Sequence, residues 1–187
     1  MVKKIFTVPK RRKREGRTDY NKRLRLLKGK MPRVVIRKSL RTITLQLVTF
    51  TPAGDKVHTS VNSITLDSFG WKFNKNNLPS CYLAGFLLGK KAVKLDITDA
   101  ILDIGMITSV KGNKLYAAAK GMIDAGLKVP CDQAVLPSMD RISGKHIESY
   151  FAKNPAGAQF GEYKKNNVNA ATITKEFEAV KKKILAI

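Results

Sequence analysis

The chain contains little of what small disulfide-bonded proteins or metalloproteins are built from. It has two cysteines, two histidines, one tryptophan and only 14 acidic residues among 187. Cys81 and Cys131 lie far apart and form no CxxC pair, so the sequence implies neither a disulfide framework nor a zinc site. We expect two reduced, buried thiols and no metal ion or other cofactor.

Long apolar runs are also missing. A membrane span needs roughly 18 apolar residues, whereas the longest candidate, 78–89, is about a dozen long and is followed by two lysines. The N-terminus, MVKKIFTVPKRRKR, lacks the apolar segment and the cleavage site of a secretory signal. These absences predict a cytoplasmic protein.

Positive charge is present in large excess. The chain has 36 Lys and Arg residues against 14 Asp and Glu, a net charge of +22, and residues 1–41 hold 17 of the basic residues and only two acids. Such a surplus repels itself and requires an anionic partner. Nucleic acid, an anionic membrane surface or an acidic protein would meet that requirement. The basic tip, Lys10 to Arg14, should be extended or disordered without its partner.

A basic helix is predicted directly after this tip, capped by Thr18 and ended by Gly29. In this helix Tyr20, Leu24 and Leu27 form a narrow apolar stripe, and cations cover most of the remaining surface. The prediction is a cationic helix with a single seam that docks.

The middle of the chain alternates between strand and helix signals. Strands are predicted at 33–38, 42–50 and 56–61, and the short links between them favour an antiparallel meander. Further predicted segments are a helix at 79–92, a strand at 100–104, helices at 113–125 and 140–151, and a surface linker at 154–171. This order indicates an α/β (mixed α+β) fold with a mixed sheet covered by helices.

The C-terminal tail repeats Ile173, Phe177, Val180 and Ile184 at helical spacing, which predicts one apolar seam that docks on the core or on a neighbour. Three parts are therefore expected: a basic arm and helix at 1–30, an α/β core at 31–151, and a linker with an amphipathic helix at 152–187.

Motifs of phosphate-binding loops and catalytic triads are not supported. Gly85 and Gly89 give a spacing one residue short of a Walker A loop and lie in a predicted helix, where small residues favour close packing. Neither His58 nor His146 lies beside a recognisable Ser or Cys motif. His58 is expected on a strand surface.

A metal-dependent nuclease is the most serious enzymatic alternative, because a three-stranded meander followed by helix, strand and helix is typical of the ribonuclease-H-like fold. The available carboxylates are Asp96, Asp99, Asp103, Asp124 and Asp140. However, the first strand, which in such enzymes supplies a central carboxylate, carries Arg33, Arg37 and Lys38 instead. Cations at that place would expel a divalent metal ion.

Two further features have alternative readings. Trp71 and Phe73, in the loop FGWKFNK, either close the core or stack on an unpaired base. Lys145 and His146 either meet a phosphate or are solvated.

The order and spacing of several long segments, from about Val8 to Tyr150, resemble the archaeal and eukaryotic form of universal large-subunit ribosomal protein 18. The segments are RRKREGRTDYNKRLRLLKGKMPRVVIRKSLRTITLQLVTFTPAGDK, FGWKFNKNNLPSCYLAGFLLGKKA, AILDIGMITSVKGNKLYAAAKGMIDAGLKVP and RISGKHIESY. Leu40 departs from the family, whose members often carry a polar residue there.

The resemblance implies a non-catalytic protein that binds 5S rRNA and attaches it to 23S rRNA in the central protuberance of the large subunit. It also implies a ribonuclease-H-like core, neighbouring ribosomal proteins as partners, and no membrane or small-molecule substrate. The residues that it places against RNA are Arg11, Arg12, Lys13, Arg14, Arg17, Tyr20, Arg23, Arg25, Arg33, Arg37, Lys38 and Arg41. To these we add Lys10, Lys28, Lys30, Lys145 and His146 as candidate contacts.

Overall fold

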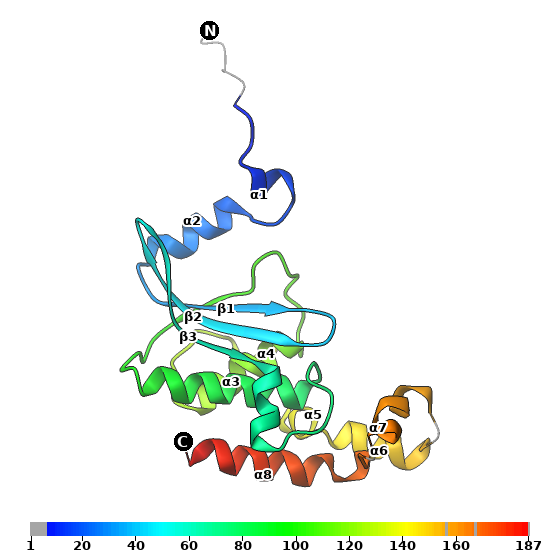
Figure 1. The fold of residues 1–187 in the computed structure, drawn as a ribbon. Coiled ribbons are helices and arrows are strands. Elements are labelled where there is room, and N and C mark those ends of the chain that lie inside the picture. The colour runs from blue at the N-terminus through cyan, green and yellow to red at the C-terminus, as the bar shows by residue number, and fades with distance from the viewer. Residues whose placement is uncertain (1–6, 156, 167, 187) are drawn as a thin grey trace.

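The computed structural model of the protein describes residues 7–155, 157–166 and 168–186 (Figure 1). Its elements, with η for 3-10 helices, are α1 (Arg11–Arg14), α2 (Tyr20–Lys28), β1 (Arg33–Lys38), β2 (Ile43–Thr51), β3 (Gly54–Asn62), η1 (Ser63–Phe69), α3 (Leu78–Val93), β4 (Ile101–Asp103), α4 (Lys114–Asp124), η2 (Gln133–Val135), α5 (Met139–Ser143), α6 (Lys145–Lys153), η3 (Ala158–Phe160), α7 (Gly161–Lys165), η4 (Ala170–Thr172) and α8 (Ile173–Leu185). Within the described part of the chain, no helix is long and apolar enough to span a membrane.

The four strands form one mixed sheet in the order β3-β2-β1-β4. β1 pairs with β2 and β2 with β3 in antiparallel fashion, whereas β4 pairs with β1 in parallel. The predicted meander and the mixed α/β class are therefore confirmed. The parallel strand follows a long crossover through α3, as parallel pairing requires.

One face of the sheet forms the core against α3. Alternate residues of β1 and β2 point to this face, and Val34, Ile36, Ile43, Leu45 and Leu47 are all completely buried. Figure 1 shows α3 below the sheet and α8 below α3, with α4 beside α3. Because it is covered on several sides, α3 is buried along most of its length and is apolar all round.

The aromatic loop after η1 belongs to the core. Trp71 and Phe73 are 1% and 2% exposed, and their rings pack against each other with centroids 5.2 Å apart. Neither ring can stack on a base in this structure, so the loop closes the core.

Two predictions for the C-terminal third are wrong. The single helix predicted at 140–151 is two helices, α5 and α6, because Gly144 between them has a left-handed φ of 90°. The segment 154–171, predicted to be a surface linker, contains short helices, and the buried Phe160 packs there against Phe151 with ring centroids 5.0 Å apart. The apolar signal of that one buried aromatic was hidden among Asn, Gly, Ala and Lys.

The apolar seam of the C-terminal helix is confirmed. Ile173, Phe177, Val180 and Ile184 of α8 are all buried, and the helix packs on α3, where Phe177 contacts Tyr82. The tail thus docks on this chain's own core.

Close packing of α3 on α4 depends on glycine. A Cβ added to Gly85 would collide with the backbone of Ala118, and one added to Gly121 would collide with the backbone of Tyr82. The predicted role of Gly85 in close helix approach is therefore confirmed.

Replacing Gly121 with Ala should lower the free energy of unfolding by about 1–3 kcal/mol, since the two helices must separate to admit the methyl group. Chemical denaturation followed by circular dichroism would measure this loss. Gly161→Ala is the matched control, because a Cβ there meets nothing within 4 Å. Equal stabilities of the two variants would contradict the packing argument.

Candidate nucleic-acid interface

The basic tip is helical for one turn and fully displayed. Residues 11–14 form the single turn α1, whereas an extended or disordered tip was predicted, and all four side chains are exposed. Glu15 contributes to this turn by ion pairs with Arg11 at 2.7 Å and Arg17 at 3.1 Å. Figure 1 shows α1 standing away from the sheet, beyond α2. The tip therefore presents its cations to solvent.

α2 connects this tip to the sheet. Asp19 caps it by accepting hydrogen bonds from the backbone N–H groups of Asn21 and Lys22, one residue later than the predicted cap. The Lys22 ammonium donates to the Gly105 carbonyl at 2.9 Å, beyond the end of β4. Lys22 thus attaches α2 to the segment after β4, in addition to the packing of the apolar residues of α2.

The predicted apolar stripe of α2 is partly wrong. Tyr20 and Leu27 are half-buried, but Leu24 is 56% exposed and Leu26 is half-buried instead. The side of the helix that carries Lys22 and Leu26 faces the protein, which leaves Leu24 at the surface. The ammonium of Lys10 lies 4.8 Å from the centre of the Tyr20 ring.

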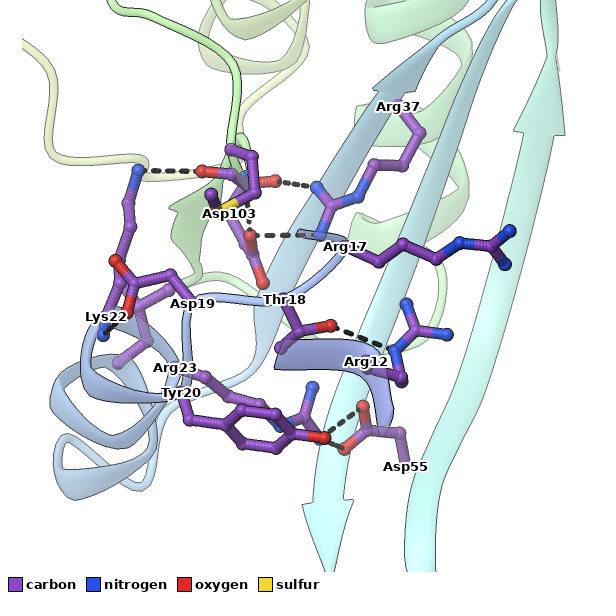
Figure 2. Close-up of a pocket in the computed structure, with 13 residues that line it drawn as sticks. Arg12, Arg17, Thr18, Asp19, Tyr20, Lys22, Arg23, Arg37, Asp55 and Asp103 are labelled. Atoms are coloured by element: carbon purple, nitrogen blue, oxygen red, sulfur yellow. Dashed lines mark hydrogen bonds and ion pairs between the residues drawn. The ribbon is translucent and has the colours of Figure 1, made fainter. Parts of the chain in front are cut away.

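A cavity of about 460 Å³ lies between the arm, α2 and the sheet (Figure 2). Its walls come from the arm and α2, from β1 and β3, and from the segment around β4. The lining residues are Arg12, Arg17, Thr18, Asp19, Tyr20, Lys22, Arg23, Leu26, Arg37, Asp55, Asp103, Gly105 and Met106. Five of them are cations and three are carboxylates, so the cavity has a positive balance suited to an anion.

Two carboxylates organise the arginines of this cavity. Asp103 at the end of β4 accepts from Arg33 at 3.0 Å and from Arg37 at 3.2 Å, and its own side chain is 9% exposed. Asp55 at the start of β3 binds Arg33 at 3.0 Å and Arg23 at 2.9 Å. Figure 2 shows Arg37 reaching Asp103 and Arg23 reaching Asp55 from different elements. The ion pairs join α2, β1, β3 and β4.

Arg33 does not contact solvent and therefore does not fit the expectation of an RNA-facing side chain. It is 1% exposed, and its guanidinium is enclosed between the two carboxylates. The physical reason is that a buried cation needs charge compensation, and Asp55 and Asp103 supply it from both sides. Arg33 therefore lies below the surface of the interface and holds Asp55 and Asp103 in place.

Arg37 is the bridge between the buried network and the surface. Its guanidinium donates to the carbonyls of Ile36 and Asp103 at 2.8 Å each, and yet its side chain is 48% exposed. A guanidinium fixed in this way keeps N–H groups free for a phosphate in a defined orientation.

The remaining N-terminal candidates are exposed at the surface. They are Lys10, Arg25, Lys28, Lys30, Lys38 and Arg41, which make no ion pair among the described residues. These residues, α1 and the cations that line the cavity all lie in one stretch of sequence, from the arm to the turn after β1. We call the basic side chains of residues 10–41, other than the buried Arg33, the N-terminal cationic surface.

Lys145 and His146 are not part of the N-terminal cationic surface. Both lie in α6, which Figure 1 places at the opposite side of the molecule from α2. Lys145 pairs with Asp140 at 2.6 Å. Burial, aided by the charge of Arg141, lowers the pKa of His146, which favours the neutral form of its ring.

Three residues that hold the interface together were not predicted from the sequence. They are Lys22, Asp55 and Asp103. Lys22 was visible as a helical cation, but its partner, the Gly105 carbonyl, lies 83 residues away. Asp55 was given no role from the sequence, and Asp103 was considered as one of the carboxylates available to a nuclease. Nothing local to either aspartate indicates an arginine partner.

The carboxylate pattern also bears on the nuclease alternative. Among the described residues, no group of three His, Cys, Asp or Glu side chains is placed to hold a metal ion. Asp103, at the end of the edge strand β4, is instead occupied by two guanidinium groups. A divalent cation there would have to displace both.

Comparison with known proteins gives one consistent result. Residues 4–99 match the family described as ribosomal large subunit proteins 60S L5 and 50S L18. Over 186 residues, the chain is 43% identical to the large ribosomal subunit protein uL18 of Korarchaeum cryptofilum, covering 97% of this chain and 95% of that protein. The proteins of the same name from Haloferax volcanii and Thermofilum pendens are 45% identical over 163 residues and 41% identical over 185 residues, covering 87% and 96% of this chain and 89% and 94% of the relatives.

The fold, its basic surface and these relatives define the class: a structural protein of the large ribosomal subunit, not an enzyme. The chain belongs to the uL18 family. The resemblance stated from the sequence is thereby confirmed, and the nuclease alternative is wrong.

Replacing Asp103 with Asn should lower the free energy of unfolding by about 3–5 kcal/mol, because it leaves the buried Arg33 guanidinium with an incomplete counter-charge. Urea denaturation would measure the loss. The matched control is Asp140→Asn, which breaks an exposed ion pair and should leave the stability nearly unchanged. If both substitutions have equally small effects, the buried network does not stabilise the fold.

Stability should also depend on the ionisation of Asp55. Burial alone raises the pKa of Asp55, but the hydrogen bonds and charges of Arg23 and Arg33 outweigh it, so the pKa lies below its ordinary value. A lowered folded-state pKa stabilises the protein above the unfolded-state pKa of about 4, and this contribution disappears as pH falls through the folded-state pKa.

Wild type should therefore be more stable than Asp55→Asn at pH 7, and the difference should shrink below about pH 4. Urea denaturation over a pH series would measure it. A difference that stays constant down to the lowest pH would show that the Asp55 carboxylate charge is not responsible.

Proposed function

We propose that this protein binds 5S rRNA and attaches it to 23S rRNA in the central protuberance of the large subunit, beside neighbouring ribosomal proteins. The observation that carries the proposal is the N-terminal cationic surface: an exposed basic helical turn, a docked basic helix and a cavity whose lining cations all come from the first 41 residues. Membership in the uL18 family supports a ribosomal partner.

The proposed RNA contacts lie along this surface and exclude the buried Arg33. They are Lys10, Arg11, Arg12, Lys13, Arg14, Arg17, Tyr20, Arg23, Arg25, Lys28, Lys30, Arg37, Lys38 and Arg41. Lys145 and His146 form a separate candidate contact on α6, where Lys145 would have to exchange Asp140 for a phosphate.

The two RNAs are proposed to meet different parts of the surface. α2 and the cavity are fixed to the sheet through Asp55 and Gly105, so they suit one rigid RNA helix. Arg12 of α1 lines the cavity, whereas Arg11, Lys13 and Arg14 are exposed and lie outside its lining, so these three cations can reach a second RNA segment (Figure 1). This geometry would let one chain hold 5S rRNA against 23S rRNA.

Phosphate neutralisation supplies most of the affinity in this proposal. Each contacted phosphate releases counterions, which makes the affinity fall steeply with salt. With six to ten phosphates contacted, affinity should weaken by roughly 10³–10⁵ between about 50 and 200 mM salt. Specificity would come from RNA shape and unpaired bases, since the deep groove of A-form RNA hides the base edges.

The core is proposed to be a ribonuclease-H-like scaffold. The sheet order β3-β2-β1-β4, with a meander and one parallel strand reached through α3, agrees with that proposal. On this proposal β1, which carries Arg33 and Arg37, serves the attachment of RNA and not the binding of a metal ion.

The test compares two full-length variants with equal net charge. In the tip variant, Arg11, Arg12, Lys13 and Arg14 are replaced by Gln; in the control variant, the exposed lysines Lys111, Lys153, Lys175 and Lys182 are replaced by Gln. The tip variant should lose affinity for 5S or 23S rRNA fragments, and the slope of log K against log salt should fall by about 3. The control should keep a slope close to that of wild type.

Filter binding or fluorescence anisotropy over a salt series would measure both slopes, and circular dichroism would verify folding. If the two variants lose affinity equally, then net charge and not the N-terminal cationic surface directs binding. If wild type binds 5S rRNA no more tightly than an unrelated RNA of equal length, the proposed function is wrong.

A further inference from the structure

A second hollow of about 510 Å³ lies at the end of β1 that is remote from α2. It is bordered by the β1–β2 turn, by η1, by the loop after Phe73, and by α7. The side chains that matter here are Leu40, Arg41, Ile64, Lys72, Tyr163 and Glu162. We call this hollow the turn groove.

The turn groove has apolar surface that the fold does not use. Leu40 is 98% exposed and Ile64 is 51% exposed, although both border a hollow whose floor includes Phe73. The ring of Tyr163 meets Phe73 edge-on, with centroids 5.7 Å apart. The groove thus offers an aliphatic and an aromatic surface to one flat apolar group.

Leu40 is also held in a fixed place. The side-chain amide of Asn76 donates to the carbonyls of Ser39 and Leu40 at 3.0 and 2.9 Å, and the Ser39 hydroxyl bonds to Thr42 across the turn. The turn is therefore anchored to the loop before α3, so displaying Leu40 costs little further ordering when a ligand binds.

The charges around the groove select an anionic ligand. Arg41 and Lys72 have no carboxylate partner among the described residues, whereas Glu162 is the one carboxylate of the lining. Arg41 also continues the N-terminal cationic surface, which runs along β1 through Arg37 and Lys38. A ligand with both a flat apolar part and phosphates fits this combination.

We propose that the turn groove binds an unpaired nucleotide of the RNA that the N-terminal cationic surface holds. The base lies against Leu40 and Tyr163, and its flanking phosphates lie at Arg41 and Lys72. A volume of 510 Å³ is within the range of about 300–1,000 Å³ typical of small-molecule sites. The site takes an unpaired nucleotide because both faces of a base inside an RNA helix are covered by its neighbours, and exposing them would cost unstacking and unpairing energy.

The inference rests on the proposed function for the identity of the RNA, and the test separates the two. Affinity for 5S rRNA is measured over a salt series for wild type, Leu40→Ser, Arg41→Gln and the control Leu95→Ser, in which a half-exposed leucine outside the groove is replaced. Leu40→Ser should weaken binding about tenfold, as loss of a base contact does, with an unchanged salt slope. Arg41→Gln should reduce the slope by about 1, and Leu95→Ser should bind like wild type.

A second arm uses an eight-nucleotide single strand containing 4-thiouridine, and the same strand in a duplex as control. Irradiation of the full-length protein with the single strand should attach the probe to the peptides that contain Leu40 or Tyr163, and the duplex should not label them. Wild type that fails to bind 5S rRNA but is labelled at the groove would contradict the proposed function and support the nucleotide site.

The proposal is overturned by wild-type affinity in Leu40→Ser together with no label at either peptide. A different result would likewise overturn it: the groove of wild type is not labelled by the RNA probe, and Leu40→Ser loses binding to a ribosomal protein. That result would assign the groove to an acidic segment of a protein.

Discussion

The interface depends on one buried guanidinium. Arg33 is 1% exposed and lies between Asp55 of β3 and Asp103 of β4, the two strands at opposite edges of the sheet. A buried cation without counter-charges is strongly unfavourable, so both carboxylates must stay in place. Each of them also binds a second arginine, Arg23 or Arg37. The position of α2 and the walls of the cationic cavity therefore follow from compensating one buried charge.

This arrangement explains why acidic residues lie inside a strongly basic surface. Asp55 and Asp103 are two of only 14 acids in the chain, and both lie in the cavity where an anion is expected. They reduce the local charge, but they also fix guanidinium groups that would otherwise move freely on long side chains. Fixing these groups before RNA arrives removes part of the ordering cost of binding. The surface gives up some electrostatic attraction in return for a defined shape.

The sequence predicted those features whose signal is local. The bounds of β1, the helix that follows Asp19 and the seam of Ile173, Phe177 and Val180 all came from spacing within one element. The burial of Arg33 could not be predicted, because Asp103, its partner, lies 70 residues away and nothing near either residue indicates the other. The break at Gly144 was missed because the apolar pattern continues across it. In the candidate site, the exposed cations were predictable and their organising carboxylates were not.

The three arginines at and beyond β1 show how position decides the role of one side chain. Arg33 and Arg37 point to the same face of the sheet, since they are four positions apart in one strand. Two carboxylates enclose the first, while the second pairs with Asp103 and remains 48% exposed. Arg41 lies beyond the strand in the turn and makes no ion pair within the described residues. The same type of side chain is thus a buried structural group at Arg33, a hydrogen-bond donor held in place at Arg37, and a cation without an ion pair among the described residues at Arg41. The gradient of burial along β1 separates the part of the chain that holds the fold from the part that is available to RNA.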